Sequence, residues 1–277
     1  MLLLVVGVAA GFVGSLSGLG GGVIVIPALT VLLGVPIQYA AGASLIATIA
    51  TSSGAASAYV KDRLANIKIG MSLEIATTLG AIAGALIAAA IYAKGLFHII
   101  FIIFGIVLLS SILPTFMQYK RSGWKKLNTD WTTKFFQLEG KYYDSSERRT
   151  IRYFGYRWWL GEAVMALAGI ISGLLGIGSG VLKVIGMDWG MKLPMKVTTS
   201  TSNFMIGVTA AAGSSVYWAL GYIQPFIAAP TVIGIIVGSF AGSRILNRSK
   251  VSKIRLFFMI ILAIAAVEMI LRGLKVL

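Results

Sequence analysis

The stretch Gly18–Leu29 has the sequence GLGGGVIVIPAL, and 158 positions later Gly176–Met187 has the sequence GIGSGVLKVIGM. The same offset aligns the chain with itself, without a gap, from Gly11 to about Ala88. Matching pairs under this offset include Gly22 with Gly180, Pro36 with Pro194, Ser44 with Ser202, Thr51 with Thr209, Tyr59 with Tyr217 and Gly84 with Gly242. Apolar composition alone would not place glycines and a proline in one register, so the chain contains an internal repeat.

The composition indicates a membrane protein. The 277-residue chain is 57% hydrophobic and 12% charged, whereas a soluble domain carries about 25% charged residues. Lys, Arg, Asp and Glu are absent from Met1–Val60 and from Leu96–Gln118. Each of these runs exceeds the roughly 20 residues that span a bilayer. Because backbone in lipid must satisfy its own hydrogen bonds, the sequence predicts an all-α polytopic membrane protein.

Ten apolar segments are predicted as helices, and a basic stretch divides them into two sets of five. The segments are residues 2–17, 21–35, 38–60, 69–93, 97–117, 158–175, 180–191, 197–220, 224–246 and 254–272. We therefore divide the chain into a first membrane repeat (1–118), a linker (119–157) and a second membrane repeat (158–277). The linker has ten basic and four acidic residues and several aromatic ones. This mixture suits either a segment lying against anionic headgroups or a solvated linker.

Basic residues between the apolar segments predict the orientation. Residues 61–68, the linker 119–157 and residues 244–255 are rich in Lys and Arg, which predicts that they are cytoplasmic and that both termini are outside. Matching helices of the two halves then run in opposite directions, so the repeats have inverted topology. The segments before Gln38 and Lys196 must each return to their starting side, and about 34 residues are too few for two crossings. Each repeat is therefore predicted as a re-entrant helical hairpin plus three transmembrane helices.

The glycine-rich tips of these hairpins are the predicted ligand site. Glycines let backbone N–H groups approach a ligand, and the start of the following helix favours an anion. Inverted repeats place the site of secondary transporters near the midplane, where two such tips would form an anion cradle. The alternative is that the glycines only permit close helix packing. The candidate substrate-binding residues at the tips are Gly20, Gly21, Gly22, Gly178, Ser179 and Gly180.

The helices after the tips differ in polarity between the halves. The run TTSTSN at Thr198–Asn203 aligns with AAGASL at Ala40–Leu45. Three polar residues of the first run share one helix face at positions i, i+3 and i+4, where they would donate hydrogen bonds to anionic oxygens. The alternative is that the hydroxyl groups bond to the preceding helical turn. The candidate substrate-binding residues here are Thr199, Ser202 and Asn203, with Ser44 and Thr48 as a weaker version in the first half.

Ionisable residues inside apolar segments are further candidates, because buried charge is costly. They are Glu74, Glu162, Lys183, Asp188, Arg244 and Glu268. Lys183 follows the second tip by three residues, and its repeat mate is Val25. It would supply positive charge to an anion or pair with a carboxylate in the empty state. The alternatives for Lys183 are snorkelling to the interface and an ion pair with Asp188. Glu74 lies near a helix end, where a structural role is expected.

The two glycine-rich stretches resemble the TauE/SafE sulfite exporter family of membrane proteins. Two further stretches carry the resemblance: KVTTSTSNFMIGVTAAAGS at Lys196–Ser214 and APTVIGIIVGSFAGSRI at Ala229–Ile245. The resemblance covers nearly the whole chain except the linker. It implies export of a sulfur-containing anion such as sulfite or an organosulfonate, coupled to protons. The chain departs from the usual family pattern at Ser179 and at Ile185, where a proline is expected.

These observations predict a secondary transporter in the cell membrane that exports a small sulfur-containing oxyanion by alternating access. A passive anion channel or a permease for another anion is the alternative. The chain has no cysteine and one histidine, His98, so an enzyme with a nucleophile–base pair, a metal site or another cofactor is not expected. The net charge of +15 lies in the connections, which favours a topological role over nucleic-acid binding. The expected partners are the anionic substrate and the bilayer, and we also consider proton coupling and a homodimer.

Overall fold

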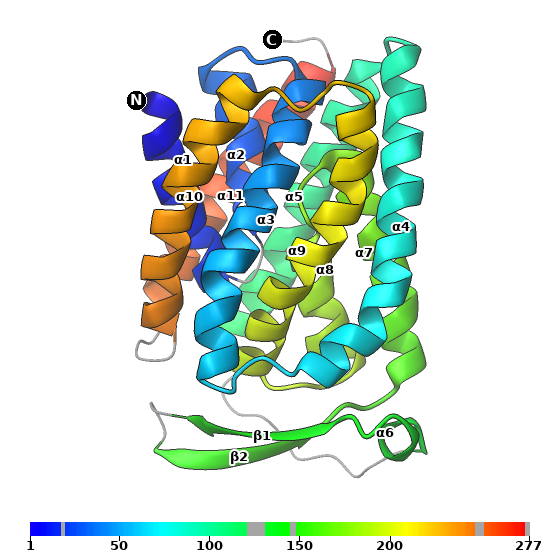
Figure 1. Ribbon diagram of the computed structural model, residues 1–277, viewed down its shortest axis with the longest axis vertical. Helices are drawn as coiled ribbons and strands as arrows, with labels where there is room; N and C mark the ends of the chain where they lie inside the picture. Colours follow the sequence, from blue (N-terminus) through cyan, green and yellow to red (C-terminus); the bar gives the residue numbers. More distant parts are fainter. Residues whose placement is uncertain (18–19, 121–130, 145–147, 247–251, 275–277) are drawn as a thin grey trace.

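The computed structural model describes residues 1–17, 20–120, 131–144, 148–246 and 252–274. Figure 1 shows a bundle of long helices with a β-hairpin lying across one end. All ten predicted apolar segments are helical. The helices of the bundle are α1 (Leu2–Ser17), α2 (Gly22–Pro27), η1 (Ala28–Leu32), α3 (Ile37–Lys61), α4 (Ile67–Ala93), α5 (Phe97–Lys120), α7 (Trp158–Leu175), α8 (Gly180–Ile185), η2 (Gly186–Gly190), α9 (Met195–Ala219), α10 (Pro225–Leu246) and α11 (Ser252–Gly273).

Among the described residues, three helices are long and apolar enough to cross a membrane by length and composition, over Ile67–Ala93, Trp158–Leu175 and Pro225–Arg244. The exposed side chains along them are largely apolar, as on Ile75, Leu79 and Ile236. A helix that is apolar on its outer face needs an apolar solvent around it, which is the situation of a helix in a bilayer.

The helices recur and pack at the offset seen in the sequence. α3 and α9 begin 158 positions apart, and so do α2 and α8. In this offset α1 matches α7, α4 matches α10 and α3 matches α9. The contact between α1 and α10 therefore repeats as the contact between α7 and α4, and the contact between α10 and α3 repeats as that between α4 and α9. The remaining main contacts pair α3 with α9 and α5 with α11, which are matching helices of the two halves. The packing is therefore related by the same repeat as the sequence.

Glycines let α1 lie close to α10 and α4 close to α7. A Cβ atom at Gly84 would overlap the carbonyl oxygen of Ile170 on α7, and one at Gly242 would lie 2.5 Å from the carbonyl oxygen of Phe12 on α1. Gly84 and Gly242 are repeat mates, as are Phe12 and Ile170. Small residues at such crossings let helix backbones touch, which is how helices associate where lipid offers no hydrophobic driving force.

The matching helices α3 and α9 lie antiparallel near the centre of the bundle (Figure 1). Just after α3 ends, the backbone N–H of Asn66 donates to Thr201 Oγ1, near the start of α9, at 3.0 Å. Near the start of α3, a Cβ atom at Gly42 would overlap the carbonyl oxygen of Tyr222, just after α9 ends. Between these ends, the Ser52 hydroxyl donates to the carbonyl oxygen of Phe204 at 3.3 Å.

Each glycine-rich tip lies between two helices that contact each other. α1 contacts α2, and α7 contacts α8. The second tip, residues 176–180, is fully buried, and so are residues 20–22 of the first tip. The returning helix changes to π-helical geometry over η1 in one half and η2 in the other. Such π segments are rare and are frequently found at functional sites.

Part of the predicted linker forms its own small structure. Residues 131–144 and 148–154 include the short helix α6 (Trp131–Phe135) and the antiparallel strands β1 (Glu139–Asp144) and β2 (Arg149–Phe154). The inward side chains of Tyr142 and Tyr153 are buried in one cluster with Leu64 and Leu193 of the bundle. These residues therefore pack against the helices and do not form a solvated linker.

Polar contacts connect this hairpin to both halves of the bundle. Lys196 of α9 forms a 2.8 Å ion pair with Asp144. Asn66, at the start of α4, donates its side-chain amide to the Tyr153 hydroxyl at 3.1 Å and to the Glu139 carbonyl oxygen at 3.3 Å. Burial raises the pKa of the Tyr153 phenol, and the hydrogen bond from Asn66 lowers it in part, so the phenol is neutral at physiological pH.

Candidate functional site

Lys183 lies fully buried inside the bundle, with an exposed fraction of 0%. α8 begins at Gly180, so Lys183 follows the second tip by about one helical turn. Its Nζ atom donates a hydrogen bond to Thr209 Oγ1 on α9. The same atom lies 3.6 Å from Glu74 Oε2 on α4. Complete burial excludes snorkelling, and the ammonium group is paired with a carboxylate far away in the sequence.

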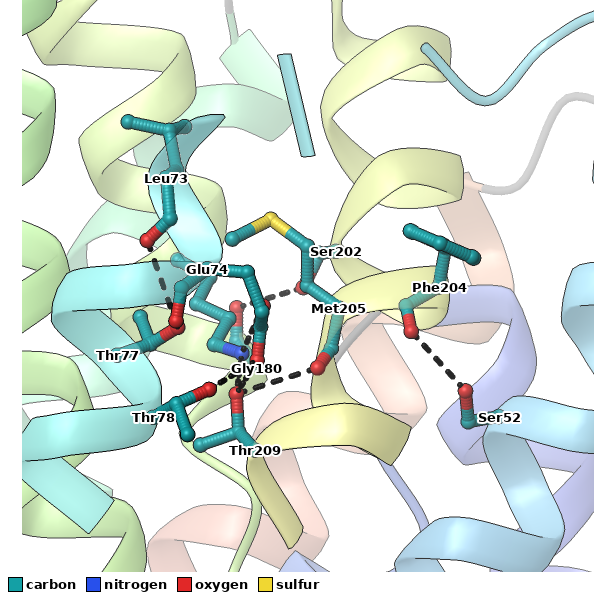
Figure 2. A network of polar contacts seen from close by, with 11 residues as sticks. Ser52, Leu73, Glu74, Thr77, Thr78, Gly180, Ser202, Phe204, Met205 and Thr209 are labelled. Atoms are coloured by element: carbon teal, nitrogen blue, oxygen red, sulfur yellow. Dashed lines mark hydrogen bonds and ion pairs between the residues drawn. The ribbon is translucent and has the colours of Figure 1, made fainter. Parts of the chain in front are cut away.

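Glu74 and Thr209 complete this buried polar cluster between α4 and α9 (Figure 2). Glu74 is 5% exposed. Its Oε1 atom accepts hydrogen bonds from the Thr209 hydroxyl at 2.5 Å and from the Thr78 hydroxyl at 3.4 Å. Its Oε2 atom is buried and accepts no hydrogen bond. Thr209 therefore accepts from the ammonium of Lys183 and donates to the carboxylate of Glu74, which links the two charges.

A buried ion pair of this kind is costly to build. Removing two charges from water carries a penalty of several kcal/mol per ion, which the mutual attraction only partly offsets. Ionisable residues inside a membrane bundle are rare and mark ion or substrate pathways. The repeat mates of Lys183 and Glu74 are Val25 and Val232. The other half therefore builds the same helices without the charges, so helix packing does not require the ion pair.

The two glycine-rich tips meet against the middle of α3. A Cβ atom at Gly20 would lie 3.5 Å from Thr48 Cγ2, and one at Gly178 would lie 2.5 Å from the same atom. A Cβ atom at Gly22 would lie 2.7 Å from Thr48 Oγ1 and would overlap Ser44 Oγ. Gly20 and Gly178 have φ values of 81° and 73°, which favour glycine. The tips therefore need glycine both for their turns and for their approach to α3.

Some hydroxyl groups around the tips are satisfied within the protein. The Ser44 hydroxyl donates to the Gly176 carbonyl oxygen at 2.7 Å, and the Ser202 hydroxyl donates to the Gly180 carbonyl oxygen at 3.3 Å. The backbone N–H of Gly21 donates to Thr51 Oγ1 at 3.3 Å. These contacts fasten each tip to α3 or α9.

Other predicted residues carry buried polar atoms without a hydrogen-bond partner. They are Thr48 Oγ1, Ser179 Oγ, Thr199 Oγ1 and Asn203 Oδ1. Leaving a polar atom buried and unpaired costs about 1–3 kcal/mol, so native proteins rarely do so without a reason. Four of the predicted substrate-binding residues thus have unused hydrogen-bonding capacity in the interior.

Asn203 connects α9 to the end of α1. Its amide nitrogen donates to the Ser15 carbonyl oxygen at 3.0 Å and to the Thr199 carbonyl oxygen at 3.2 Å. The Tyr59 hydroxyl donates to the same Ser15 oxygen at 2.8 Å. Both N–H groups of Asn203 therefore bind backbone in this structure, and the amide oxygen is the part that remains unpaired.

The structure thus arranges the predicted residues in three groups. Gly20, Gly22, Gly178, Ser44 and Thr48 come together where the tips meet α3. Lys183 joins Thr209 and Glu74, while Asn203 and Thr199 lie on the face of α9 that contacts Ser15. The positions of Gly18 and Leu19, at the start of the first tip, lie outside the described residues.

Glu74 is a residue of this cluster that the sequence offered as a buried ionisable candidate but placed near a helix end, where a structural role was expected. Its position within about two turns of the start of α4 suggested a helix-end carboxylate. One available signal was its repeat mate, because an acid that replaces Val232 of the other half breaks the repeat in the same way as Lys183. The sequence singled out Thr209 only because it matches Thr51 in the repeat.

Comparisons with known proteins identify the family of the chain. The family model described as "Sulfite exporter TauE/SafE" matches residues 3–269. The "Probable membrane transporter protein YunE" of Bacillus subtilis (strain 168) is 28% identical over 99% of this chain and 98% of its own length. The "Probable membrane transporter protein YdhB" of the same organism is 26% identical over 89% of each chain. No solved structure matches the chain. The family match spans nearly all the helices described above, so this chain belongs to the TauE/SafE sulfite exporter family of membrane transporters.

Proposed function

We propose that the protein is a secondary transporter that exports a small sulfur-containing oxyanion, such as sulfite or an organosulfonate, by alternating access. The observation that carries this proposal is the fully buried Lys183, paired with Glu74 through Thr209. An oxyanion that enters the site can take the place of the carboxylate beside the ammonium group. Burial makes this charge interaction stronger than it would be in water.

The tips supply the second part of the proposed site. Thr48 and Ser179 lie at the meeting point of the two hairpins, and their buried hydroxyl groups have no partner. Thr199 adds a third unpaired hydroxyl on α9. A hydroxyl group can donate one hydrogen bond to an anionic oxygen. Together with Lys183 these groups would give a tetrahedral or pyramidal oxyanion several donors from different helices.

Alternating access would use the repeated architecture. We interpret the two halves as inverted-topology repeats, each made of a re-entrant hairpin and three transmembrane helices. This interpretation is supported by the recurrence of elements at one offset, the antiparallel α3 and α9, and the buried tips. Inverted repeats place a site where the halves meet, so that rocking one half against the other exposes it to each side in turn.

A flux assay tests the proposal. The purified protein is reconstituted into liposomes, and the uptake of sulfite, methanesulfonate, sulfate, phosphate and chloride is compared. We expect saturable transport and counterflow for sulfite or the sulfonate and not for chloride. Current without saturation or counterflow would indicate a channel, and preference for phosphate or chloride would indicate a permease for another anion.

Replacing Lys183 tests the assignment of the site. Lys183→Met keeps most of the length of the side chain and removes the charge, and a charge-assisted hydrogen bond is worth about 1.5–3 kcal/mol. We therefore expect transport at sub-saturating substrate to fall by about 10- to 100-fold. Lys94→Met is the matched control, because Lys94 is exposed at the end of α4. Unchanged transport by folded Lys183→Met protein would exclude this role for Lys183.

A further inference from the structure

We propose that Glu74 is the proton-binding site of the transporter and that one proton moves with each monovalent anion in the same direction. This inference rests on the proposed function, because it assumes that an anion binds beside Lys183. It goes further by naming the residue that binds the proton, the direction of coupling and the stoichiometry.

The first argument is the balance of charge in the buried cluster. In the structure, one ammonium group and one carboxylate face each other, with Lys183 0% and Glu74 5% exposed. The empty site is therefore neutral. Arrival of a monovalent anion would leave one net negative charge in an interior where unpaired charge is strongly unfavourable. One proton on Glu74 restores neutrality, with Lys183 as the cation and the substrate as its counter-ion.

The second argument is the geometry of the carboxylate. Glu74 Oε1 is held by the hydroxyl groups of Thr209 and Thr78. Oε2 accepts no hydrogen bond and faces the ammonium at 3.6 Å. When the ammonium group of Lys183 pairs with a substrate anion instead, Oε2 is the carboxylate oxygen that is left without a positive charge beside it. Oε2 can then bind a proton. The proton would enter from the same aqueous side as the anion, and both would leave together on the other side.

The third argument is the absence of a competing charge near Glu74 among the described residues. α4 packs against α7 and α9, and α8 brings Lys183 to it. On α9, Lys196 pairs with Asp144 of the hairpin at the end of the bundle. On α7, Glu162 is half-buried, and among the described residues no ion pair joins it to Lys183. Within the described part of the chain, Lys183 is the charged group that contacts Glu74, so the protonation of Glu74 depends on what Lys183 binds.

Proton movement can be measured directly in the wild type. Proteoliposomes are loaded with methanesulfonate and a pH-sensitive dye and diluted into medium of the same pH without the anion. Methanesulfonate does not titrate near neutral pH, so any proton movement belongs to the protein. We expect the interior to become alkaline as the anion leaves, with one proton per anion, and the flux to be insensitive to an imposed membrane potential.

Glu74→Gln separates binding from coupling. The amide imitates the protonated carboxyl and can still accept the hydrogen bond from Thr209. We expect one-for-one exchange of labelled methanesulfonate to persist within several-fold, whereas net proton-linked efflux falls by at least about 10-fold. A residue that only holds α4 to α9 would affect exchange and net efflux equally. Glu162→Gln is the matched control, because Glu162 is also an acid in an apolar helix but does not contact Lys183.

The outcomes distinguish the two levels of the proposal. If the wild type moves neither methanesulfonate nor sulfite, the proposed function fails, and this inference fails with it. If the wild type moves the anion without a proton, or with a proton in the opposite direction, the inference alone is overturned. The wild-type measurement tests whether a proton moves with the anion even where Glu74→Gln does not fold. In that case, the double variant Glu74→Gln/Lys183→Met shows whether a neutral pair restores folding.

Discussion

At the scale of single residues, complete burial is what makes Lys183 informative. A lysine side chain has a long apolar stem and normally carries its charge to an interface. Here the ammonium group stays inside, because Thr209 and Glu74 supply partners from two other helices. Because burying both charges is costly, such a pair is expected only where it has a function. The exchange of the carboxylate partner for a substrate is such a function.

The glycine of the second tip offers a residue-scale prediction. Gly178 has a φ of 73°, and a Cβ atom there would lie 2.5 Å from Thr48 Cγ2. We expect Gly178→Ala to lower the free energy of unfolding by about 1–3 kcal/mol, through overpacking and an unfavourable backbone angle. Thermal unfolding of the purified protein in detergent measures this change.

Gly213→Ala is the control for that prediction. A Cβ atom at Gly213 would have its nearest neighbour at 3.7 Å, which is an ordinary contact. Gly213 lies inside α9, where alanine is the better helix former by about 1 kcal/mol. We therefore expect unchanged or slightly raised stability. Equal losses for the two variants would contradict the steric argument for the tip.

At the scale of elements, the hairpin connects the two halves at one end of the bundle. β1 is joined to α9 by Asp144 and Lys196, and both strands are joined to the start of α4 by Asn66. Strands this short are marginal on their own. Burial of Leu138, Tyr142 and Tyr153 against the helices is what gives this pair of strands a fixed place.

The ion pair between the hairpin and α9 gives a prediction at this scale. Asp144 is 6% and Lys196 19% exposed, and the two charged atoms lie 2.8 Å apart. We expect Asp144→Asn and Lys196→Met each to lower the free energy of unfolding by about 1–3 kcal/mol. The double variant should lose less than the two single losses combined, because the singles break the same contact.

Lys68→Met is the control for the ion pair. The Lys68 ammonium donates to Gln137 Oε1 at 3.4 Å, in an exposed contact between α4 and the residue pair that precedes β1. Exposed contacts of this kind change stability by about 0.5 kcal/mol or less. Additive effects of the Asp144 and Lys196 variants would show that the ion pair does not fasten the hairpin.

At the scale of the whole molecule, the prediction concerns which ends of the bundle share a side. Figure 1 places the connection from α4 to α5 and the connection from α9 to α10 at one end, with the hairpin at the other. Single cysteines at Lys94 and Gly221 should therefore label from outside, and those at Arg63 and Lys141 from inside. The chain has no cysteine of its own, so each label reports one position. Labelling of Lys94 and Gly221 from opposite faces would exclude the inverted arrangement.

The choice of labelling positions depends on the structure. Leu64, beside Arg63, lies in the predicted cytoplasmic connection but is fully buried, so Arg63 is the accessible position. Residues 130 and 250, which the basic connections also predict to be inside, lie outside the described residues. Lys141 on β1 takes their place, because it is exposed.

Much of the helical framework can be derived from the sequence. Long apolar runs must be helical in lipid, and glycines and prolines repeated at one offset mark two related halves. These signals are local or periodic, so the ten helical segments and the two buried tips follow from them. The family resemblance is carried by the same stretches, and the match over residues 3–269 confirms it.

The chemistry of the site depended on tertiary structure. Lys183 pairs with Glu74, although Asp188 is closer in sequence. The sequence marks both residues as departures from the repeat, but it does not show that α8 contacts α4, because that contact depends on how α4, α7 and α9 pack together. The β-hairpin could not be predicted from the sequence either, because its strands are stabilised by burial against distant helices and not by their own strand propensity. Helix formation is settled by hydrogen bonds within a segment, whereas the partner of a buried charge is settled by which segments the fold brings together.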